Sequence, residues 1–496
     1  MSLSHEMKKA GILLHISSLH GGFGIGDFGR PAYEFVDFLV ECGQTYWQIL
    51  PIGYIGYANS PYQCYGSKAL NPYFIDPYGF SDEGLCTRSW LDGLGGTLNS
   101  GKVDYNEMFR VKNMIFDRAF TGFNPGRADY VDFKRQHKEW LDDFALFIVL
   151  LKKTKNLTIR EFAPGILGRD PDALADSLYK YRTEIEREKF LQFFAFRQWM
   201  RLREYANGKG IKIIGDIPIY LSFDSVEVWT DREMFRMGPG LVMRQAAGVP
   251  PDKMSDKGQI WGNPVYDWKY HAKTGYGWWI DRISFALSLF DIIRIDHFRG
   301  FAKYYAVKEP FDDAHKGRWK KGPGFKLFRK VNRIFDSSRI IAEDLGHITR
   351  DVRRLIRKTG YCGMKVAQFG FSGDMKNEHH PYNYPLKSFS YTGTHDNNTL
   401  MGWYSGMFPE DRKILEKMVV GISGENVNLR IIEMVMRSDS KAAIVPMQDY
   451  LGLGSSARMN TPSTISGNWE WRMPGIPAGI SGLVVRMTEK RKAEHE

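Results

Sequence analysis

The stretch DIIRIDHFRG, residues 291–300, joins a short run of branched apolar residues to a cluster of charged ones. Ile292, Ile293 and Ile295 predict a buried strand, and Asp296 follows directly where that strand ends. Apolar runs of this kind are typical of parallel strands that are covered on both faces. Because a parallel barrel gathers the residues at the ends of its strands onto one face, Asp296 is a candidate functional residue.

Seven further apolar runs bounded by turn residues bring the expected strands to eight, the number that a closed barrel requires. The eight candidates are residues 11–16, 46–51, 211–217, 291–295, 339–343, 364–369, 388–391 and 442–447. Helical patterns lie between several of them, for example from Pro31 to Gly43 and over residues 184–206. The recurring order of strand, helix and strand predicts parallel pairing. We therefore predict an α/β fold, a (β/α)8 TIM barrel.

The expected strands are unevenly spaced along the chain. The second and third, and again the third and fourth, are separated by far more residues than a crossover needs. We expect residues 1–496 to form a single catalytic barrel with large subdomain insertions over its C-terminal mouth. Residues 53–210 are expected to be a mainly helical insertion between strands 2 and 3. Residues 220–290 are expected to be a loop-rich insertion between strands 3 and 4 that lines the active site.

The composition predicts an ordinary soluble globular protein. Of the 496 residues, 43% are hydrophobic and 25% are charged, which is enough to bury a large core. The net charge of +11 is the only feature that favours nucleic-acid binding. However, the basic residues are interspersed with acids, and the densest group, residues 486–494, has the composition of a solvated end. We expect no nucleic-acid partner, because charge of this kind favours solubility and weak contacts.

The cysteines and the N-terminus predict a cytoplasmic protein. Cys42, Cys64, Cys86 and Cys362 have no spacing suited to zinc or redox chemistry, so a reducing compartment is expected. The apolar run over residues 10–14 is interrupted by a histidine, is too short for a membrane span and is followed by no cleavage site. We expect no metal, no cofactor, no membrane association and no obligate protein partner.

Three carboxylates stand where expected strands run out into loops: Asp296, Glu343 and Asp396. A retaining glycosidase needs one carboxylate as nucleophile and a second carboxyl about 5 Å away as acid and then base. Asp296 is flanked by Arg294 and His297, so we expect its pKa to be lowered and the carboxylate to stay ionised. The alternative is a structural Arg-Asp pair at the end of a strand.

Glu343 and Asp396 each have a structural alternative as well. Glu343 follows an apolar strand, and a glutamate in a partly apolar pocket has its pKa raised and can act as a general acid. Glu343 or Asp344 could instead cap the next helix. Asp396 lies in a polar run, residues 393–399, that suits hydrogen bonds to sugar hydroxyls, but Asp396 or Asn397 could also cap a helix. A metal site is disfavoured there because no partner His or Cys stands at ligand spacing.

Three further segments add polar and aromatic groups. Residues 215–220 end another strand with Asp216, and residues 248–264 predict a long ordered loop that carries Trp261. A tryptophan is commonly a core residue, but on a loop rich in Pro and Gly we interpret it as a stacking platform for a sugar ring. Residues 59–64 follow the second strand with turn chemistry and an aromatic ring, or form a plain surface turn.

Taken together, these segments resemble the 4-α-glucanotransferases known as amylomaltases or disproportionating enzymes, glycoside hydrolase family 77 of the α-amylase clan. The similarity extends from residues 11–15 and 24–27 to residues 468–472, NWEWR, and so covers nearly the whole chain. The most specific motifs are NSPYQ (59–63), GQIWGNP (258–264), RIDHFRG (294–300), AEDLG (342–346) and TGTHDN (392–397).

The resemblance implies an amylase-type barrel with 4-α-glucanotransferase activity (EC 2.4.1.25) in glycogen and starch metabolism. Such an enzyme transfers α-1,4-glucan segments from a donor to the 4-hydroxyl of an acceptor glucan or glucose, so the expected partners are maltooligosaccharide or α-1,4-glucan substrates. By resemblance, Asp296 is the nucleophile of a retaining double displacement through a covalent glycosyl-enzyme, Glu343 is the acid/base and Asp396 is the transition-state stabiliser.

The same resemblance suggests roles for eight further residues. It implies that Arg294 orients Asp296, and that His395 and Asp216 contact the sugar at the point of cleavage. The residues expected to line the glucan channel are Ser60, Tyr62, Asp252, Gln259 and Trp261.

The chain departs from the family pattern at three places. It has Cys64-Tyr65 where members often carry Ser and Phe, Lys253-Met254 where an aromatic is common after Pro-Pro-Asp, and Ser463 where Gly is expected between Pro and Thr. We expect these differences to affect the preferred glucan length or acceptor before they affect the chemistry. Two alternatives to transfer stay open, namely an α-glucan hydrolase of the amylase type and a catalytically silent glucan-binding barrel.

Overall fold

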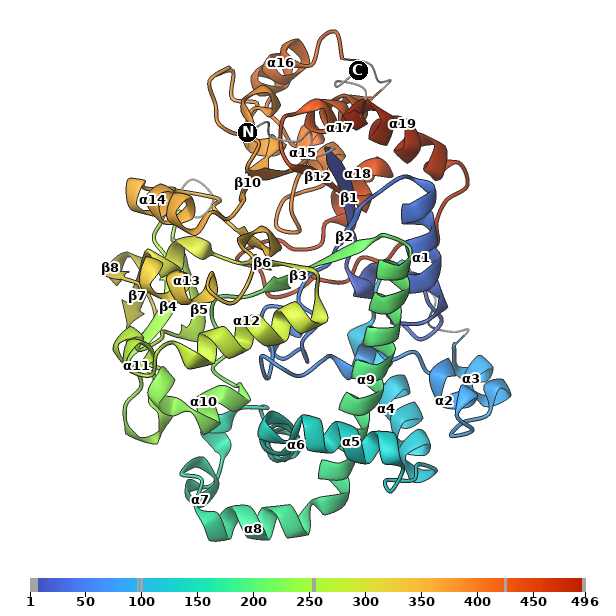
Figure 1. Cartoon of the computed structure of the whole chain (residues 1–496), viewed down its shortest axis with the longest axis vertical. Helices are drawn as coiled ribbons and strands as arrows, with labels where there is room; N and C mark the ends of the chain where they lie inside the picture. Colours follow the sequence, from blue (N-terminus) through green and yellow to red (C-terminus); the bar gives the residue numbers. More distant parts are fainter. Residues whose placement is uncertain (1–7, 96–97, 99–100, 252–255, 423–425, 493–496) are drawn as a thin grey trace.

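The protein is described by a computed structural model over residues 8–95, 98, 101–251, 256–422 and 426–492 (Figure 1). All eight expected strands are present, at β1 (Lys9–Leu13), β2 (Tyr46–Gln48), β3 (Lys212–Ile217), β6 (Ile292–Ile295), β9 (Ile340–Ala342), β10 (Gly363–Val366), β11 (Ser388–Tyr391) and β12 (Ala442–Pro446). Each ends within a few residues of the predicted limit.

These eight strands form one parallel sheet that nearly closes on itself. Its order is β10-β11-β12-β1-β2-β3-β6-β9, with parallel pairing at every step. The two edge strands meet where the Ala342 N–H donates a hydrogen bond of 2.9 Å to the Cys362 carbonyl oxygen, just before β10. The predicted eight-stranded α/β barrel is therefore confirmed.

The segment between β2 and β3 is mainly helical. It contains α2 (Tyr78–Asp82), α3 (Arg88–Gly95), α4 (Tyr105–Thr121), α5 (Ala128–Gln136), α6 (Lys138–Lys152), α7 (Pro164–Leu167), α8 (Pro171–Lys180) and α9 (Arg182–Gly208). The long helix α9 joins this layer to the barrel (Figure 1). In its first half Phe190 stacks on Phe80 and Phe194 packs against the same ring at a tilt. Further along, Trp199 meets Phe290 beside the barrel, with ring centroids 5.7 Å apart.

A second, antiparallel sheet lies beside the barrel and was not predicted. Its order is β5-β4-β7-β8, from β4 (Gln245–Val249), β5 (Gln259–Pro264), β7 (Lys303–Lys308) and β8 (Arg318–Lys321). The prediction of a long ordered loop over residues 248–264 is therefore wrong at both ends, because β4 and β5 occupy those ends and pair with each other. The reason is tertiary, because β4 gains its second partner from β7, which follows β6 in the chain.

The remaining helices surround the barrel or connect its strands. They are α1 (Arg30–Glu41), α10 (Val226–Thr230), α11 (Trp268–Lys273), α12 (Gly277–Leu289), α13 (Phe325–Val331), α14 (Arg350–Thr359), α15 (Leu400–Ser405), α16 (Pro409–Met418), α17 (Val427–Arg437), α18 (Met447–Tyr450) and α19 (Ile480–Lys492). Within the described ranges, no helix is both long and apolar enough to cross a membrane.

The interpretation of residues 486–494 as a solvated end is wrong for Arg491. This side chain is buried on α19 and donates hydrogen bonds to the carbonyl oxygens of Met436 and Ser438, at 2.9 and 2.8 Å. Its Nε also donates to the carbonyl oxygen of Lys9, at the start of β1, at 3.0 Å. The C-terminal helix is therefore fastened to the barrel by a guanidinium group.

The packing of the barrel wall can be tested at Gly215 on β3. A Cβ added there would overlap the ring of Phe290, directly after α12. We predict that Gly215→Ala lowers the free energy of unfolding by about 1–3 kcal/mol, because close-packed neighbours must shift to admit the methyl group. Thermal midpoints at a fixed scan rate check this. Gly93→Ala on α3 is the control, since a Cβ there meets no atom within 4 Å; equal losses for both substitutions would contradict the prediction.

Candidate active site

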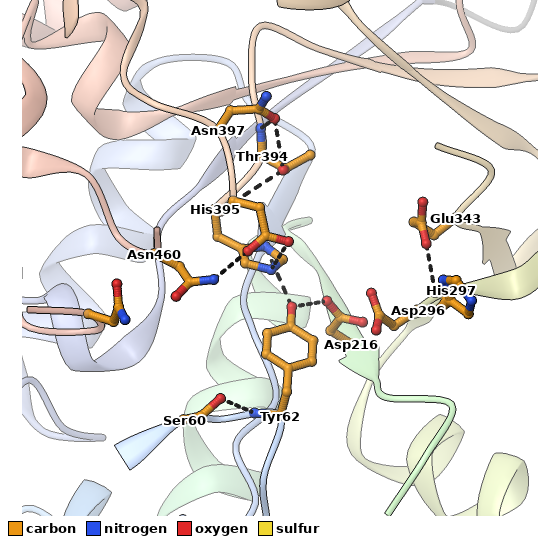
Figure 2. Close-up of polar contacts among 12 residues, drawn as sticks. Ser60, Tyr62, Asp216, Asp296, His297, Glu343, Thr394, His395, Asn397 and Asn460 are labelled. Carbon is orange, nitrogen blue, oxygen red and sulfur yellow. Dashed lines mark hydrogen bonds and ion pairs between the residues drawn. The ribbon is translucent and has the colours of Figure 1, made fainter. Parts of the chain in front are cut away.

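The predicted site residues gather at the carboxyl ends of the barrel strands (Figure 2). Arg294 lies on β6, and Asp296 follows that strand directly. Glu343 directly follows β9, whereas Asp216 belongs to β3. Asp396 lies in the turn after β11. Four strand ends that are distant in sequence, those of β3, β6, β9 and β11, therefore bring these residues to one end of the barrel, as the barrel prediction requires.

Arg294 links two of these carboxylates in a buried network. Its Nη1 lies 2.5 Å from Asp216 Oδ2, and its Nη2 lies 2.9 Å from Asp296 Oδ1. Asp216 Oδ2 also accepts a hydrogen bond of 2.8 Å from the Tyr62 hydroxyl. Arg294 and Asp216 are almost fully buried, whereas 27% of the Asp296 side chain is exposed. Asp296 is thus held by a cation while part of its side chain stays exposed.

Backbone amides hold the carboxylate of Glu343. Its Oε2 accepts a hydrogen bond of 2.7 Å from the His297 N–H, and its Oε1 accepts one of 2.7 Å from the Leu345 N–H. His297 adopts a left-handed backbone conformation with φ 46°, which turns the chain directly after Asp296. The next helix, α14, begins after Thr349, so neither Glu343 nor Asp344 is its cap. The capping alternative for Glu343 is therefore excluded.

Asp396 is not a helix cap either. The helix after it, α15, is capped by the hydroxyl of Thr399, which accepts a hydrogen bond from the Gly402 N–H. Asp396 Oδ2 lies 3.4 Å from His395 Nε2, and the His395 ring stacks on Tyr62 with centroids 5.0 Å apart. Through Tyr62 this turn joins the network of Arg294.

Burial changes the pKa values of the site residues. It raises the pKa of Asp296 to about 8, opposed by Arg294 and reinforced by the negative charges of Asp216, Glu343 and Asp396. The expectation of a lowered pKa is therefore wrong, because one guanidinium serves several carboxylates in a desolvated pocket. Burial also raises the pKa of Glu343, as expected, against Arg294 and its two amide donors. It lowers the pKa of His395.

The remaining predicted residues lie around this cluster. Ser60 accepts a hydrogen bond of 3.3 Å from the Tyr62 N–H. Trp261 lies on β5 rather than on a loop, and its ring meets the His297 ring edge-on at 4.9 Å. Gln259 accepts a hydrogen bond of 2.9 Å from the Trp261 indole N–H. Asp252 lies outside the described residues. No group of three or more His, Cys, Asp or Glu within the described ranges is arranged to hold a metal ion.

Two residues of the site were not predicted as such. His297 was noted only as a neighbour of Asp296, yet its backbone positions Glu343 and its ring contacts Trp261. Asn460 donates a hydrogen bond of 2.6 Å from Nδ2 to Asp396 Oδ1. Asn460 is 64 residues further along the chain, in a loop without periodicity, so only its polar character before Thr461-Pro462 could have drawn attention to it.

A parallel barrel that brings several carboxyl groups together at the ends of its strands suits an enzyme that processes glycosides. Comparisons with known proteins agree with this class. Residues 14–477 match the family model described as 4-alpha-glucanotransferase, glycoside hydrolase family 77. A 4-alpha-glucanotransferase from Clostridium butyricum is 42% identical over 467 residues, covering 92% of this chain and 95% of that protein. One from Thermus thermophilus is 40% identical, with 96% of both chains covered.

Solved structures are similar over the same extent. An amylomaltase from Streptococcus agalactiae, solved in complex with acarbose, has a TM-score of 0.93 at 36% identity and covers 97% of this chain and 98% of its own. An amylomaltase from Corynebacterium glutamicum shares the fold at 17% identity, with a TM-score of 0.78, covering 98% of this chain and 75% of its own. The chain belongs to the 4-alpha-glucanotransferase family, glycoside hydrolase family 77. Its enzyme class is 4-alpha-glucanotransferase, EC 2.4.1.25, and its substrates are glucans.

The raised pKa of Asp296 leads to a prediction about how stability depends on pH. Because folding raises the pKa of Asp296, the folded state holds its proton more tightly than the unfolded state does. The wild type therefore loses stability as the pH rises from the ordinary range of an aspartate towards about 8. We predict that Asp296→Asn is more stable than the wild type at pH 8, by roughly 1 kcal/mol, and that this advantage fades as the pH falls to 4.

Thermal midpoints of both proteins across this pH range provide the measurement. Asp176→Asn is the matched control, since Asp176 lies exposed on α8 and forms no ion pair in the described part of the chain. If the difference between wild type and Asp296→Asn does not widen with pH, the raised pKa is contradicted.

Proposed function

We propose that the chain transfers α-1,4-glucan segments by a retaining double displacement in which Asp296 is the nucleophile. The observation that carries this proposal is the ion pair from Arg294 to Asp296, which fixes the carboxylate while leaving it partly exposed. In the first step an oxygen of Asp296 bonds to the anomeric carbon as the bond to the departing glucan oxygen breaks. The product of this step is a covalent glycosyl-enzyme.

In this proposal Glu343 supplies and recovers the proton. It protonates the departing oxygen in the first step and then accepts the proton of the acceptor 4-hydroxyl, whose oxygen displaces Asp296 from the anomeric carbon. Two inversions give retention. Supporting evidence is that burial raises the pKa of Glu343, so the carboxyl can hold a proton, and that the His297 and Leu345 amides keep it beside the β6 strand end.

Asp216, Asp396 and His395 are proposed to bind the sugar at the point of cleavage. Asp216 Oδ1 is buried and has no hydrogen-bond partner among the described residues, so it is a ready acceptor for a sugar hydroxyl. Asp396 keeps 45% of its side chain exposed beside His395, which suits binding of ring hydroxyls. Carboxylates that bind hydroxyls more tightly in the transition state than in the ground state accelerate the reaction.

Competition between acceptor and water decides whether the intermediate is transferred or hydrolysed. We propose that the insertion over residues 220–290 covers the site, that Trp261 stacks on the acceptor sugar, and that Ser60, Tyr62 and Gln259 line the glucan channel. The edge-on contact of Trp261 with His297 supports this assignment, because it holds an aromatic ring next to the residue that orients Glu343.

A cytoplasmic site of action is proposed on the chemistry of the cysteines alone. Cys42, Cys64 and Cys86 are free thiols in the structure. Free thiols are typical of reducing compartments.

Incubation with maltotriose tests the proposed reaction. The wild type should release glucose and form longer maltodextrins without a net rise in reducing ends, whereas reducing ends that accumulate without longer chains would contradict transfer. Asp296→Asn and Glu343→Gln should each lose at least about 1,000-fold in turnover. With maltosyl fluoride as donor, Glu343→Gln should recover its first step, because fluoride departs without a proton, and Asp296→Asn should not. Recovery of Asp296→Asn would contradict the nucleophile assignment.

Trp261 makes a separate prediction about the fate of the intermediate. We predict that Trp261→Ala lowers the ratio of transfer to hydrolysis by about 10-fold, because loss of stacking weakens acceptor binding by roughly 1–2 kcal/mol and admits water. Product analysis over a range of acceptor concentrations measures this ratio. Trp319→Ala is the control: Trp319 lies on β8 of the same sheet, and its ring packs on Arg299 and Tyr305. Equal ratios in the two variants would contradict acceptor stacking by Trp261.

A further inference from the structure

Asn460 forms a clasp with the turn that carries Asp396. Its Nδ2 donates a hydrogen bond of 2.6 Å to Asp396 Oδ1 (Figure 2). Its backbone N–H donates one of 3.1 Å to the His395 carbonyl oxygen. Arg458 adds two bonds from the same segment, with Nη2 donating to the Asp396 carbonyl oxygen at 2.6 Å and Nε to the Asn460 carbonyl oxygen at 2.7 Å. Residues 458–460 thus hold Asp396 by its backbone and by its carboxylate.

Without the hydrogen bond from Asn460, the carboxylate of Asp396 would be free to rotate. Asp396 lies in a turn, has no ion pair with Lys or Arg among the described residues, and leaves 45% of its side chain exposed. With Oδ1 on Asn460, Oδ2 lies towards His395 Nε2 at 3.4 Å. An amide donor of this kind adds no charge, so it fixes the direction of the carboxylate without neutralising it.

The clasp itself is rigidly supported. Met459, between its two members, is buried and accepts a hydrogen bond of 2.7 Å on its carbonyl oxygen from the Trp469 N–H. The Trp469 ring packs against both Tyr62 and His395, at centroid distances of 6.0 and 5.9 Å. Asn460 is therefore set by the same aromatic cluster that borders the sugar site.

We propose that Asn460 is a positioning residue that fixes the carboxylate of Asp396 in the orientation in which it binds the ring hydroxyls of the transition state. This inference rests on the proposed function, in which Asp396 stabilises that transition state. Groups that hold a functional side chain in place have measurable effects, since hydrogen bonds to charged groups are stronger than those between neutral groups.

The first test is a double-mutant cycle on the donor maltosyl fluoride, which does not depend on the proton of Glu343. Asn460→Ala should lower kcat by about 10- to 100-fold, with KM changed by less than about threefold. In an Asp396→Asn background the same substitution should lower kcat by less than about threefold, because the carboxylate that Asn460 binds is absent. Full additivity of the two losses would overturn the proposal.

The second test distinguishes positioning from general support of the loop. Asn460→Asp keeps the shape but adds a negative charge beside Asp396, so the acid limb of kcat/KM should move to higher pH. Asn468→Ala is the control: its Oδ1 accepts a hydrogen bond of 2.8 Å from the Thr461 N–H in the same loop, without contact to Asp396. In Asn468→Ala the acid limb of kcat/KM should stay within about 0.2 pH units of its wild-type position. A neighbouring charge shifts a pKa by about one unit or more, so this limit separates the two variants.

Each outcome bears on a separate claim. If Asn468→Ala reproduces the full kinetic change of Asn460→Ala, including the pH shift of the aspartate variant, Asn460 supports only the loop and the proposal is overturned. If Asp396→Asn alone leaves turnover of maltosyl fluoride intact, the proposed role of Asp396 fails first, and the inference about Asn460 fails with it.

Discussion

The guanidinium of Arg294 is the group on which the site depends. It lies buried on β6, opposite Asp216 in the register of the neighbouring strand β3, and reaches forward to Asp296 at the strand end. A buried charge that loses its partner costs about 3–5 kcal/mol, so a single cation between two carboxylates binds the two strands and the site together. The same group holds Asp296, the proposed nucleophile, at the end of β6 while part of that side chain stays exposed.

Segments from both ends of the chain complete the pocket around this pair. Tyr62, from the loop after β2, donates to Asp216 and stacks on His395 from the turn after β11. Trp469, from the C-terminal part of the chain, packs against both rings. The pocket is therefore formed only when the barrel nearly closes, because its walls come from strands that are distant in sequence.

The strands and the three carboxylates could be predicted because both depend on local patterns. A buried parallel strand is a continuous apolar run, and an acid directly after it must lie at the barrel mouth. The antiparallel sheet could not be predicted, since β4 is completed by β7 from beyond β6. The pKa of Asp296 is raised first by burial and then by the carboxylates that share one guanidinium with it. The contact from Asn460 depends on a loop that returns to the site. Neither is visible in a local pattern.

Two departures from the family pattern now have a physical description. Cys64 donates from Sγ to the Pro61 carbonyl oxygen at 3.0 Å, a role that the serine hydroxyl common in the family can also fill. Ser463 adopts φ 68°, a left-handed conformation that glycine adopts at lower cost, which explains why glycine is expected there. Both lie on loops that border the site, and neither touches Asp296 or Glu343.

The central claim is that Asp296, held by Arg294, forms the covalent bond to the sugar. Intact-protein and peptide mass spectrometry of Glu343→Gln, quenched in acid after incubation with maltosyl fluoride without acceptor, tests it most directly. The account predicts the added mass of one maltosyl group, carried by the peptide that contains Asp296. An adduct on Asp396 or Asp216, or fluoride release with no adduct on any peptide, would contradict it.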